Sequence, residues 1–456
     1  MIRRFQDHLR STSLIPKGAK LLVGYSGGAD STCLLHLLHL CGRDVVAGHL
    51  HHGQRREADE EMRRCREFAE SIGIPFASGQ ADVPLIASQM KVGREEAGRH
   101  ARYEFFRRAA AELGCDIIAT AHTLDDDIET VLLNIVRGCG LGGLAGIPAR
   151  RAKIVRPMLE FSRMETRAYC AEQGLWFHDD PANDDISFAR ARIRQRVVPE
   201  IEAINPSVRQ AILRLSNLAS EEDSFLDAAA AAALEQCEIE MNGPLRFLTL
   251  DREVWLERGK LAHLPVVLLR RAIRLTSHVL GAELDHDQTR AIVEGLRSTQ
   301  SGSITAEFGR VVVEWKPSTV SVRSLDVPPF LKEPLSMAGE VHGAGWKMTA
   351  ENVDPANYQR SRGSLEVVID ADSIRGGLEL RRGEHGAEMR PLNMDGKKKL
   401  ADILADGKLT EAARRTLPVV CDSEGPVWVP SIALADRVKI SERTRRATLL
   451  RFGPTP

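Results

Sequence analysis

The 456-residue sequence contains no apolar run near the roughly 20 residues that a membrane-spanning helix needs. Its opening stretch, MIRRFQDHLRSTSLIPKGAK, has basic side chains but neither the apolar segment nor the small-residue cleavage site of a secretory signal. Both absences argue against membrane insertion and export. We therefore expect a cytoplasmic location.

The eight cysteines are scattered along the chain and include no C-x-x-C pair. This spacing argues against a zinc site and against a disulfide framework, so we expect small buried apolar side chains. Histidines gather at His49, His51, His52 and His122, but no cysteine or carboxylate completes a zinc-like spacing around them. We expect no zinc.

The sequence also lacks an excess of either charge, because 62 Lys and Arg face 63 Asp and Glu. The formal net charge of −1 does not indicate a nucleic-acid binder, and such a partner must be held by local basic patches. Hydrophobic residues make up 43% and charged residues 27%, as in a globular protein.

The first part of the chain alternates between two kinds of pattern. Helix-like stretches with a period near 3.6 separate short β-rich runs at residues 21–25, 44–52, 75–80 and 116–122. This alternation predicts an α/β fold with a doubly wound parallel sheet, in which ligands bind at the carboxyl ends of the strands. We assign residues 1–215 to this catalytic domain.

The remaining chain is long enough for two further domains at roughly 150 residues each. Helix-like composition and periodicity predict a mostly helical middle domain over residues 216–330. Short β-type runs surround the basic, helix-like stretch GKKKLADILADGKL, and they predict a small α+β domain over residues 331–456.

The most informative stretch, Ser26-Gly27-Gly28-Ala29-Asp30-Ser31, follows the first β-run and opens a helix-like segment. A strand, a glycine-rich turn and a helix N-terminus aim several N–H groups at one place, which favours an anion. The loop has no lysine, so it is not the Walker sequence, and it is not G-x-G-x-x-G. It predicts a pyrophosphate cradle, and a capped strand-to-helix turn is the alternative.

Charged residues later in the chain suggest chemistry. Asp125 and Asp126 follow a β-run and could hold Mg²⁺, and Glu129 falls on the same helical face as Asp125. The alternative is a solvated acidic helix N-terminus. Arg99 and Arg102 are three residues apart, so on a helix they could clamp a phosphate or carboxylate together, or be solvated.

The loop resembles the SGGxDS loop of the N-type ATP pyrophosphatases, which cleave ATP between the α- and β-phosphates. Other motifs resemble, in chain order, those of the tRNA(Ile)-lysidine synthetases: the HLHHG stretch from His49, Gly98–Tyr103, Ala121–Thr130, Arg156–Leu159, Asp180–Asn183 and Arg190–Arg194. The stretch after Gly396 resembles the family's C-terminal domain. Four positions depart from the family's pattern: His51, Thr123, Asp127 and Ala191.

The resemblance implies a ligase that adenylates the wobble cytidine of an isoleucine tRNA with a CAU anticodon and joins L-lysine to its C2 atom. ATP and Mg²⁺ are the implied cofactors, with Asp125 and Asp126 as the implied metal ligands. The implied catalytic residues are Asp30, Asp125, Asp126, Glu129, Arg99 and Arg102. The implied ATP-binding residues are Ser26, Gly27, Gly28, Ala29, Asp30, Ser31 and His52. The implied tRNA-binding residues are Asn183, Arg190, Arg192, Arg194, Lys397, Lys398 and Lys399.

Three other functions stay open at this point. A tRNA thiolase of the same superfamily is expected to need a cysteine pair or an iron–sulfur cluster, and the cysteine spacing argues against it. A small-molecule amidating synthetase would not need the basic strip at residues 190–196 or a basic C-terminal domain. A catalytically silent tRNA-binding protein is disfavoured by the intact phosphate loop. A homodimer is compatible with the sequence.

Overall fold

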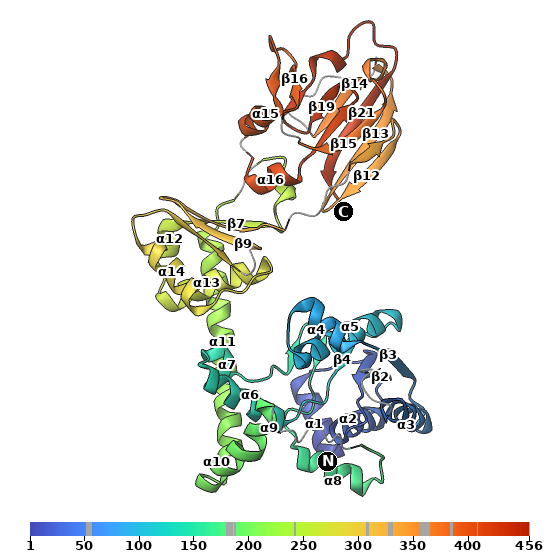
Figure 1. Ribbon diagram of the computed structural model, residues 1–456, viewed down its shortest axis with the longest axis vertical. Helices are drawn as coiled ribbons and strands as arrows, with labels where there is room; N and C mark the ends of the chain where they lie inside the picture. Colours follow the sequence, from blue (N-terminus) through green and yellow to red (C-terminus); the bar gives the residue numbers. More distant parts are fainter. Residues whose placement is uncertain are drawn as a thin grey trace. The chain divides into compact units, whose positions relative to one another are not determined.

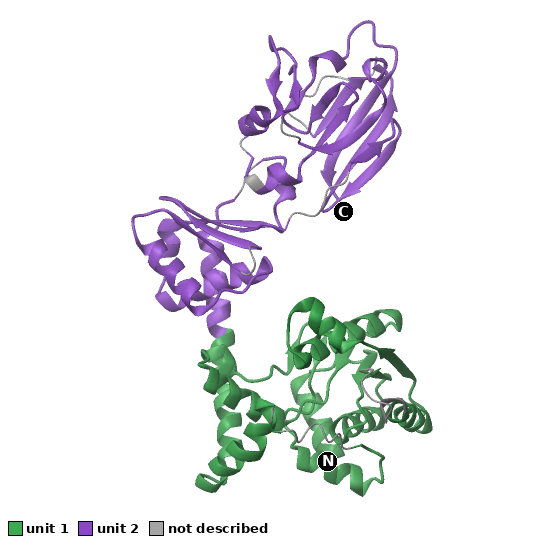
Figure 2. Cartoon of the chain, in the orientation of Figure 1, with its two compact units in different colours: residues 1–224 green, residues 225–456 purple. Residues whose placement is uncertain are grey.

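The structure is a computed structural model that describes residues 1–51, 57–178, 186, 188–240, 243–306, 310–326, 332–355, 365–383, 386–407 and 409–455. His52 and Asn183, predicted to bind ATP and tRNA, lie outside the described residues. The chain forms two compact units, Met1–Ser224 and Phe225–Pro456 (Figure 2). Helix α11 (Val208–Cys237) runs without a break through the predicted domain boundary at residues 215 and 216.

Unit 1 is built on a six-stranded sheet with the order β3-β2-β1-β4-β6-β5. Its strands are β1 (Leu21–Gly24), β2 (Val45–His51), β3 (Phe76–Gln80), β4 (Ile117–Ala119), β5 (Arg150–Arg151) and β6 (Ile154–Val155). All neighbouring strands are parallel except β5, which is antiparallel to β6. The predicted doubly wound parallel sheet is confirmed.

Helices cover both faces of this sheet. Neighbouring side chains of a strand point to opposite faces, so each face has an apolar core of its own. Leu21 and Val23 pack into one core and Leu22 into another. The first core includes residues of α1 (Ile2–Thr12), α2 (Ala29–Leu40), α3 (Glu57–Ser71) and α8 (Arg163–Glu172). The second is covered by α5 (Arg94–Glu112), beside α4 (Val83–Met90), as Figure 1 shows.

The rest of unit 1 is helical. In chain order, its first two helices come after β4, and the others come after β6. It comprises α6 (Leu124–Arg137), α7 (Leu141–Leu144), α9 (Ala189–Arg192), a π-helical turn (Ile193–Val197), α10 (Val198–Ile204) and the start of α11. Apolar residues of α6, the π-helical turn and α11 form a core of their own, which includes Ile128, Ile193 and Ile212. This core joins α6 to the arginine-rich stretch after residue 188.

The first part of unit 2 is helical, as predicted, and also contains a sheet that the sequence analysis did not include. Its helices after α11 are α12 (Arg258–His263), α13 (Val266–Val279) and α14 (His286–Arg297). They share a core with an antiparallel sheet of order β7-β10-β9-β8. The strands are β7 (Glu253–Glu257), β8 (Gly302–Ala306), β9 (Val311–Trp315) and β10 (Thr319–Ser324).

The C-terminal part of unit 2 is the predicted α+β fold, with two antiparallel sheets around one core. One sheet contains β11 (Glu333–Leu335), β15 (Leu378–Arg382), β18 (Pro418–Asp422), β19 (Gly425–Val429) and β20 (Ala433–Leu434). The other contains β12 (Gly339–Gly343), β13 (Trp346–Val353), β21 (Ala447–Pro454) and β14 (Glu366–Asp370). The helices are α15 (Leu400–Asp406) and α16 (Glu411–Thr416).

The basic stretch in this part differs from its helix-like appearance in the sequence. Lys398 and Lys399 form strand β17, which pairs antiparallel with β16 (Glu388–Met389), and the helix begins only at Leu400. The pairing partner lies ten residues earlier, so local composition did not indicate it. None of the described helices is both long and apolar enough to cross a membrane.

Candidate active site

The predicted phosphate loop connects β1 to α2 at the carboxyl edge of the sheet. Gly27 has a φ of +83°, and a Cβ atom there would lie 2.7 Å from Cys65 Sγ, so only glycine fits. The Ser31 hydroxyl donates to the Gly28 backbone oxygen over 2.9 Å and lies 3.1 Å from Ser26 Oγ. These contacts fix the turn, and the first N–H groups of α2 are left without partners inside the helix.

Asp30 stands in the first turn of α2 and is held by groups from α8. The Thr166 hydroxyl donates to Asp30 Oδ1, and Arg163 Nε lies 3.7 Å from Asp30 Oδ2. Burial, together with the charge of Asp126, raises the pKa of Asp30 to about 6, although the Thr166 hydroxyl and the Arg163 guanidinium oppose this shift. Near neutral pH this carboxyl can therefore exchange a proton.

The second acidic group begins α6, where Thr123 is the N-cap. The Thr123 N–H and hydroxyl both donate to Asp126 Oδ2, over 2.8 and 2.9 Å, and Thr123 and Asp126 form a capping box at the start of the helix. Asp125 Oδ2 accepts from the Arg163 backbone N–H over 2.8 Å, and Arg209 Nη1 lies 2.5 Å from Asp125 Oδ1. Burial would raise the pKa of Asp126, but the Arg163 guanidinium and Thr123 outweigh it and lower the pKa.

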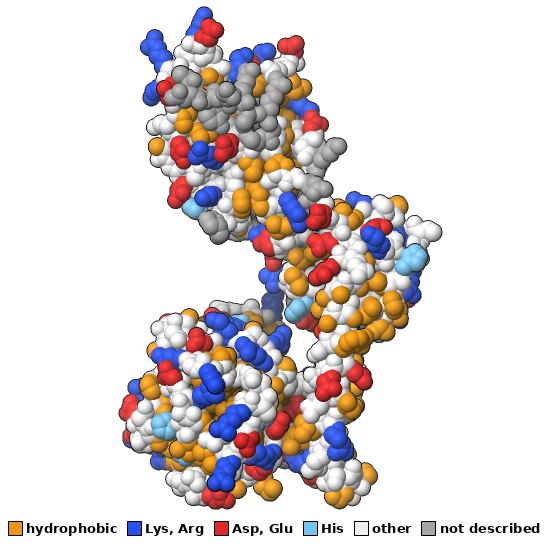
Figure 3. All heavy atoms as spheres, turned by 180° about the vertical axis from the view of Figure 1, so that it is seen from behind, with side chains coloured by type: hydrophobic (Ala, Val, Ile, Leu, Met, Phe, Trp, Pro, Cys, Tyr) orange, Lys and Arg blue, Asp and Glu red, His pale blue; other side chains and the backbone are white. Residues whose placement is uncertain are grey.

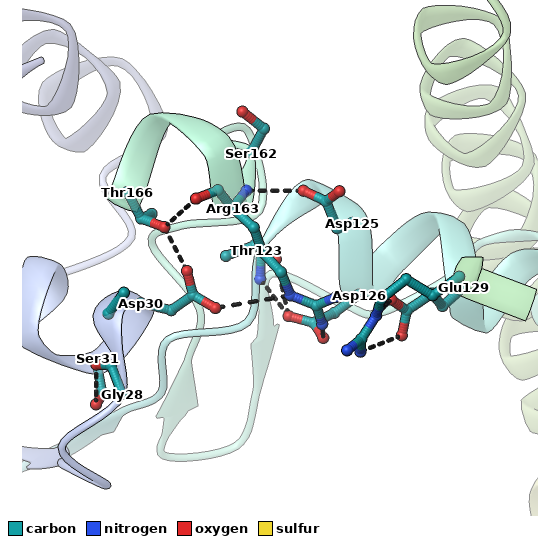
Figure 4. A network of polar contacts seen from close by, with 12 residues as sticks. Gly28, Asp30, Ser31, Thr123, Asp125, Asp126, Glu129, Ser162, Arg163 and Thr166 are labelled. Atoms are coloured by element: carbon teal, nitrogen blue, oxygen red, sulfur yellow. Dashed lines mark hydrogen bonds and ion pairs between the residues drawn. The ribbon is translucent and has the colours of Figure 1, made fainter. Parts of the chain in front are cut away.

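Arg163, the first residue of α8, joins the two acidic groups. Its guanidinium donates to Asp126 Oδ1 and, over 2.7 Å, to Glu129 Oε1, and it also faces Asp30 (Figure 4). Glu129 is almost fully buried and takes a second guanidinium, because Arg194 Nε lies 2.7 Å from the same oxygen. The structure thus brings together the predicted residues Asp30, Asp125, Asp126 and Glu129 around an arginine.

Three members of this cluster were not predicted from the sequence: Arg163, Thr166 and Arg209. One signal was available, because Ser162 and Glu165 form a capping box with the S-x-x-E spacing. That spacing marks the start of a helix directly after the Arg156–Leu159 motif and places Arg163 in its first turn. Nothing in the local sequence indicates that this turn faces the phosphate loop.

Each of the four oxygens of Asp125 and Asp126 accepts a hydrogen bond from a protein donor, so Mg²⁺ bound there would have to use their remaining lone pairs or replace these donors. Among the described residues, no group of three or more His, Cys, Asp or Glu side chains could hold a metal ion. Magnesium ligation by these two carboxylates stays a prediction.

Arg99 and Arg102 are exposed on α5, and Arg99 lies over the Tyr103 ring with 5.3 Å between the guanidinium carbon and the ring centre. Among the residues that the structure describes, no hydrogen bond or ion pair joins either arginine to the carboxylate cluster, but Arg99 lies close enough to act on His122. Burial, together with the charges of Arg156, Arg99 and Arg190, lowers the pKa of His122 to about 4, although the charge of Asp126 opposes this shift. His122 is therefore neutral at pH 7.

The predicted tRNA-binding residues fall on both units. In unit 1, Arg192 is exposed, Arg190 Nη2 lies 3.5 Å from Thr130 Oγ1, and Arg194 is paired with Glu129. Basic side chains are spread across the visible face of unit 1 in Figure 3. In unit 2, Lys397 and Lys399 are exposed, whereas Lys398 is paired with Asp406.

The four departures from the family's pattern have structural roles where the structure describes them. Thr123 caps α6, and Ala191 and His51 are buried. Asp127 is buried and accepts from the Ile147 N–H over 2.6 Å, so it supports the loop after α7 and does not face the carboxylate cluster. The phosphate loop and Asp30 are untouched by these changes.

Comparison with known proteins agrees with this geometry. Residues 1–201 match the family described as the PP-loop domain, and residues 378–450 match the TilS substrate C-terminal domain. A tRNA(Ile)-lysidine synthase of Dehalococcoides mccartyi is 28% identical, covering 99% of both chains. Those of Geobacillus kaustophilus and Geobacter sulfurreducens are each 30% identical, covering 95% of this chain and 95% and 93% of their own.

A parallel sheet with a glycine-rich loop at its carboxyl edge, matched by the PP-loop family, defines an ATP-using enzyme of the PP-loop class. The similarity extends beyond that domain over nearly the whole length of the relatives. The chain belongs to the tRNA(Ile)-lysidine synthase family.

Proposed function

We propose that this enzyme joins free L-lysine to C2 of the wobble cytidine of an isoleucine tRNA with a CAU anticodon, using ATP and giving lysidine, AMP and pyrophosphate. The observation that carries the proposal is similarity to lysidine synthases along nearly the whole chain, catalytic and C-terminal parts alike. The phosphate loop with Asp30 beside it supports the nucleotide half of the reaction.

The first step is adenylation of the base. The C2 oxygen of the cytidine attacks the α-phosphorus of ATP, the bond to the β-phosphate oxygen breaks, and pyrophosphate leaves. The N–H groups at the start of α2, with the Ser26 and Ser31 hydroxyls, bind the leaving pyrophosphate and stabilise its charge. The base is accessible because an anticodon loop is single-stranded.

The second step transfers lysine. The ε-nitrogen of lysine attacks C2, the bond from C2 to the adenylate oxygen breaks, and AMP leaves. The attacking amine must be neutral, so its ammonium form first loses a proton. Asp30 is the proposed acceptor, because its raised pKa of about 6 allows it to take a proton near neutral pH.

Other parts of the proposal concern binding. Arg99, Arg102, Arg190 and Arg192 contact phosphates of ATP or tRNA, and Lys397 and Lys399 contact the tRNA backbone. Mg²⁺ enters only as the counter-ion of ATP, and no step is assigned to it. We place the reaction in the cytoplasm. The homodimer that the sequence allowed is not part of this proposal.

The test is incorporation of labelled L-lysine into an unmodified isoleucine tRNA transcript with a CAU anticodon, with Mg²⁺-ATP present and AMP assayed in parallel. We expect label in the RNA that requires ATP and equals the AMP formed. Asp30→Ala should abolish it, whereas Asp7→Ala, an exposed carboxylate of α1, should leave it unchanged. A transcript with uridine at the wobble position should take up no label.

Two other outcomes would identify the rival functions. AMP that forms only with a sulfur donor, with sulfur entering the RNA, would indicate a thiolase. AMP that forms only with ammonia and a small carboxylic acid, without tRNA, would indicate an amidating synthetase. Either result would contradict the lysidine proposal.

A further inference from the structure

Arg163 lies among three carboxylates and uses every part of its guanidinium there. Nη2 donates to Asp126, Nη1 to Glu129 over 2.7 Å, and Nε lies 3.7 Å from Asp30. A planar guanidinium with a fixed fork of donors can serve several carboxylates at once in this way. The three acids come from two helices, α2 and α6, and Arg163 comes from a third.

The position of Arg163 is set independently of these ion pairs. It is the first residue of α8, whose N-cap Ser162 and Glu165 form a capping box. Its backbone N–H donates to Asp125 over 2.8 Å. The backbone contact and the guanidinium contacts both hold Arg163 in the site, and its side chain is only 24% exposed.

The charge balance of the cluster follows from these contacts. Asp30, Asp126 and Glu129 carry three negative charges, and Arg163 and Arg194 supply two positive charges by direct contact. Without these arginines the three carboxylates would carry an uncompensated charge of about −3, and this charge would attract a hard divalent cation, which prefers oxygen ligands. With them, the cluster is nearly neutral and a guanidinium occupies its centre.

We propose that Arg163 is the resident counter-ion of the acidic cluster, a positioning residue that keeps Asp30, Asp126 and Glu129 together and keeps free divalent cations off them before nucleotide binds. A cation placed on Asp30 and Asp126 would lie next to the guanidinium and be repelled by it. Removing the positive charge therefore converts the cluster from an arginine site into a cation site.

The test is binding of Mn²⁺ to the full-length protein without nucleotide, lysine or tRNA, measured by the loss of the free Mn²⁺ signal in electron paramagnetic resonance. Arg163→Met should bind one Mn²⁺ at least about tenfold more tightly than the wild type, because the repelling charge is gone. Arg163→Lys, which keeps the charge, should resemble the wild type. Arg167→Met, on the exposed side of α8, is the matched control and should not change binding.

A double variant locates the new site. Asp30→Asn added to Arg163→Met should remove the gained Mn²⁺ binding, because Asp30 would be one of its ligands. No gain in a folded Arg163→Met protein, checked by circular dichroism, would overturn the proposal. A general loss of packing would not create one tight Mn²⁺ site, so a purely structural role for Arg163 predicts no gain.

A measurement on the wild-type protein tests the proposal even if no variant at Arg163 folds. Wild-type protein that binds Mn²⁺ tightly without nucleotide, with binding that Asp126→Asn removes, would also overturn the proposal. The inference concerns the same site as the proposed reaction but does not rest on lysine transfer. Failure of lysine incorporation would leave the Mn²⁺ result unaffected, and the reverse also holds.

Discussion

At the scale of single residues, the phosphate loop depends on glycine at one position for two separate reasons. Gly27 has a positive φ, and any Cβ there would contact Cys65 Sγ. Left-handed backbone alone costs a larger residue about 1 kcal/mol. To relieve the contact with Cys65, the loop itself would have to move. The N–H groups of this loop are the ones that we propose bind the phosphate oxygens.

We predict that Gly27→Ala weakens ATP binding by more than about tenfold, or 1.4 kcal/mol, in a protein that still folds. Calorimetric titration with ATP measures this effect. Gly42→Ala is the matched control, because Gly42 also has a positive φ, of 66°, but no atom lies within 4 Å of its added Cβ. Equal ATP affinity in the two variants would contradict the role assigned to the loop.

Asp30 makes a pH-dependent contribution to stability whose sign follows from its raised pKa. The carboxyl titrates near 6 in the folded chain and near 3.8 when exposed, so between these values the folded state binds more protons. Ionised Asp30 therefore costs stability, and this cost appears as pH rises from 4 through 6. Asparagine carries no such cost.

We predict that the stability of Asp30→Asn relative to the wild type rises by up to about 3 kcal/mol between pH 4 and pH 7. Urea unfolding followed by circular dichroism at the two pH values measures the difference. Asp7→Asn, on the exposed side of α1, should show no comparable rise. A constant difference for Asp30→Asn would contradict the raised pKa.

The residues that the sequence predicted and those it missed differ in how their positions are determined. The loop glycines, Asp30 and Asp126 act through local geometry, so a strand, a turn and a helix start were enough to indicate them. Arg163 reaches Asp30 across more than 130 positions of sequence, and only packing of α8 against α2 brings them together. Spacing along the chain does not contain that contact.

At the scale of elements, the parallel strands of unit 1 were easier to predict than the antiparallel sheet β7-β10-β9-β8 of unit 2. The strands β1 to β4 are separated by whole helices, so each appears as an isolated apolar run. By contrast, β8, β9 and β10 follow one another closely and were hidden by the strongly helical pattern of α13 and α14 before them. The helices were predicted and the sheet that covers them was not.

This sheet and α14 are joined by a buried arginine. The Arg258 guanidinium donates to the backbone oxygens of five residues at the end of α14 and in the segments beside it: Gly295, Leu296, Ser298, Gln300 and Lys316. The last carbonyl groups of a helix have no partners within the helix, so this side chain supplies them. Arg258 thereby fixes the end of α14 to the turn between β9 and β10.

We predict that Arg258→Met destabilises this part of unit 2 by about 3 kcal/mol or more, because buried carbonyl groups lose their donors. Hydrogen exchange measured by mass spectrometry should show faster exchange over residues 286–297. Arg290→Met is the control within α14. The ion pair of Arg290 with Asp287 is exposed and should contribute under about 0.5 kcal/mol. Similar protection in both variants would contradict the capping role.

At the scale of the whole molecule, the two family matches fall on different compact units. The PP-loop match lies within unit 1 and the C-terminal match within unit 2, and α11 is continuous between the units. The proposed nucleotide site lies in unit 1, because Asp30, Asp126 and Arg163 all belong to it. Contact with a large substrate such as tRNA can therefore be altered in unit 2 without changing the ATP site.

Lys397, Lys398 and Lys399 provide the means to separate these two activities. We predict that changing all three to Ala lowers tRNA affinity about tenfold and reduces the salt dependence of binding, because each lost phosphate contact removes roughly 0.7 to 0.9 from the slope. ATP affinity should not change. Filter binding over a range of salt concentrations, with calorimetry for ATP, measures both quantities.

The control for this variant removes the same charge from the same unit at Lys316, Lys347 and Lys439. If only total charge mattered, both triple variants would bind tRNA equally weakly, since long-range attraction depends on net charge. If the lysines at 397–399 contact the tRNA backbone directly, only the variant that lacks them binds tRNA with a reduced salt dependence. Lys398 is already paired with Asp406, so most of the loss should come from Lys397 and Lys399, and Lys398→Ala alone should have little effect.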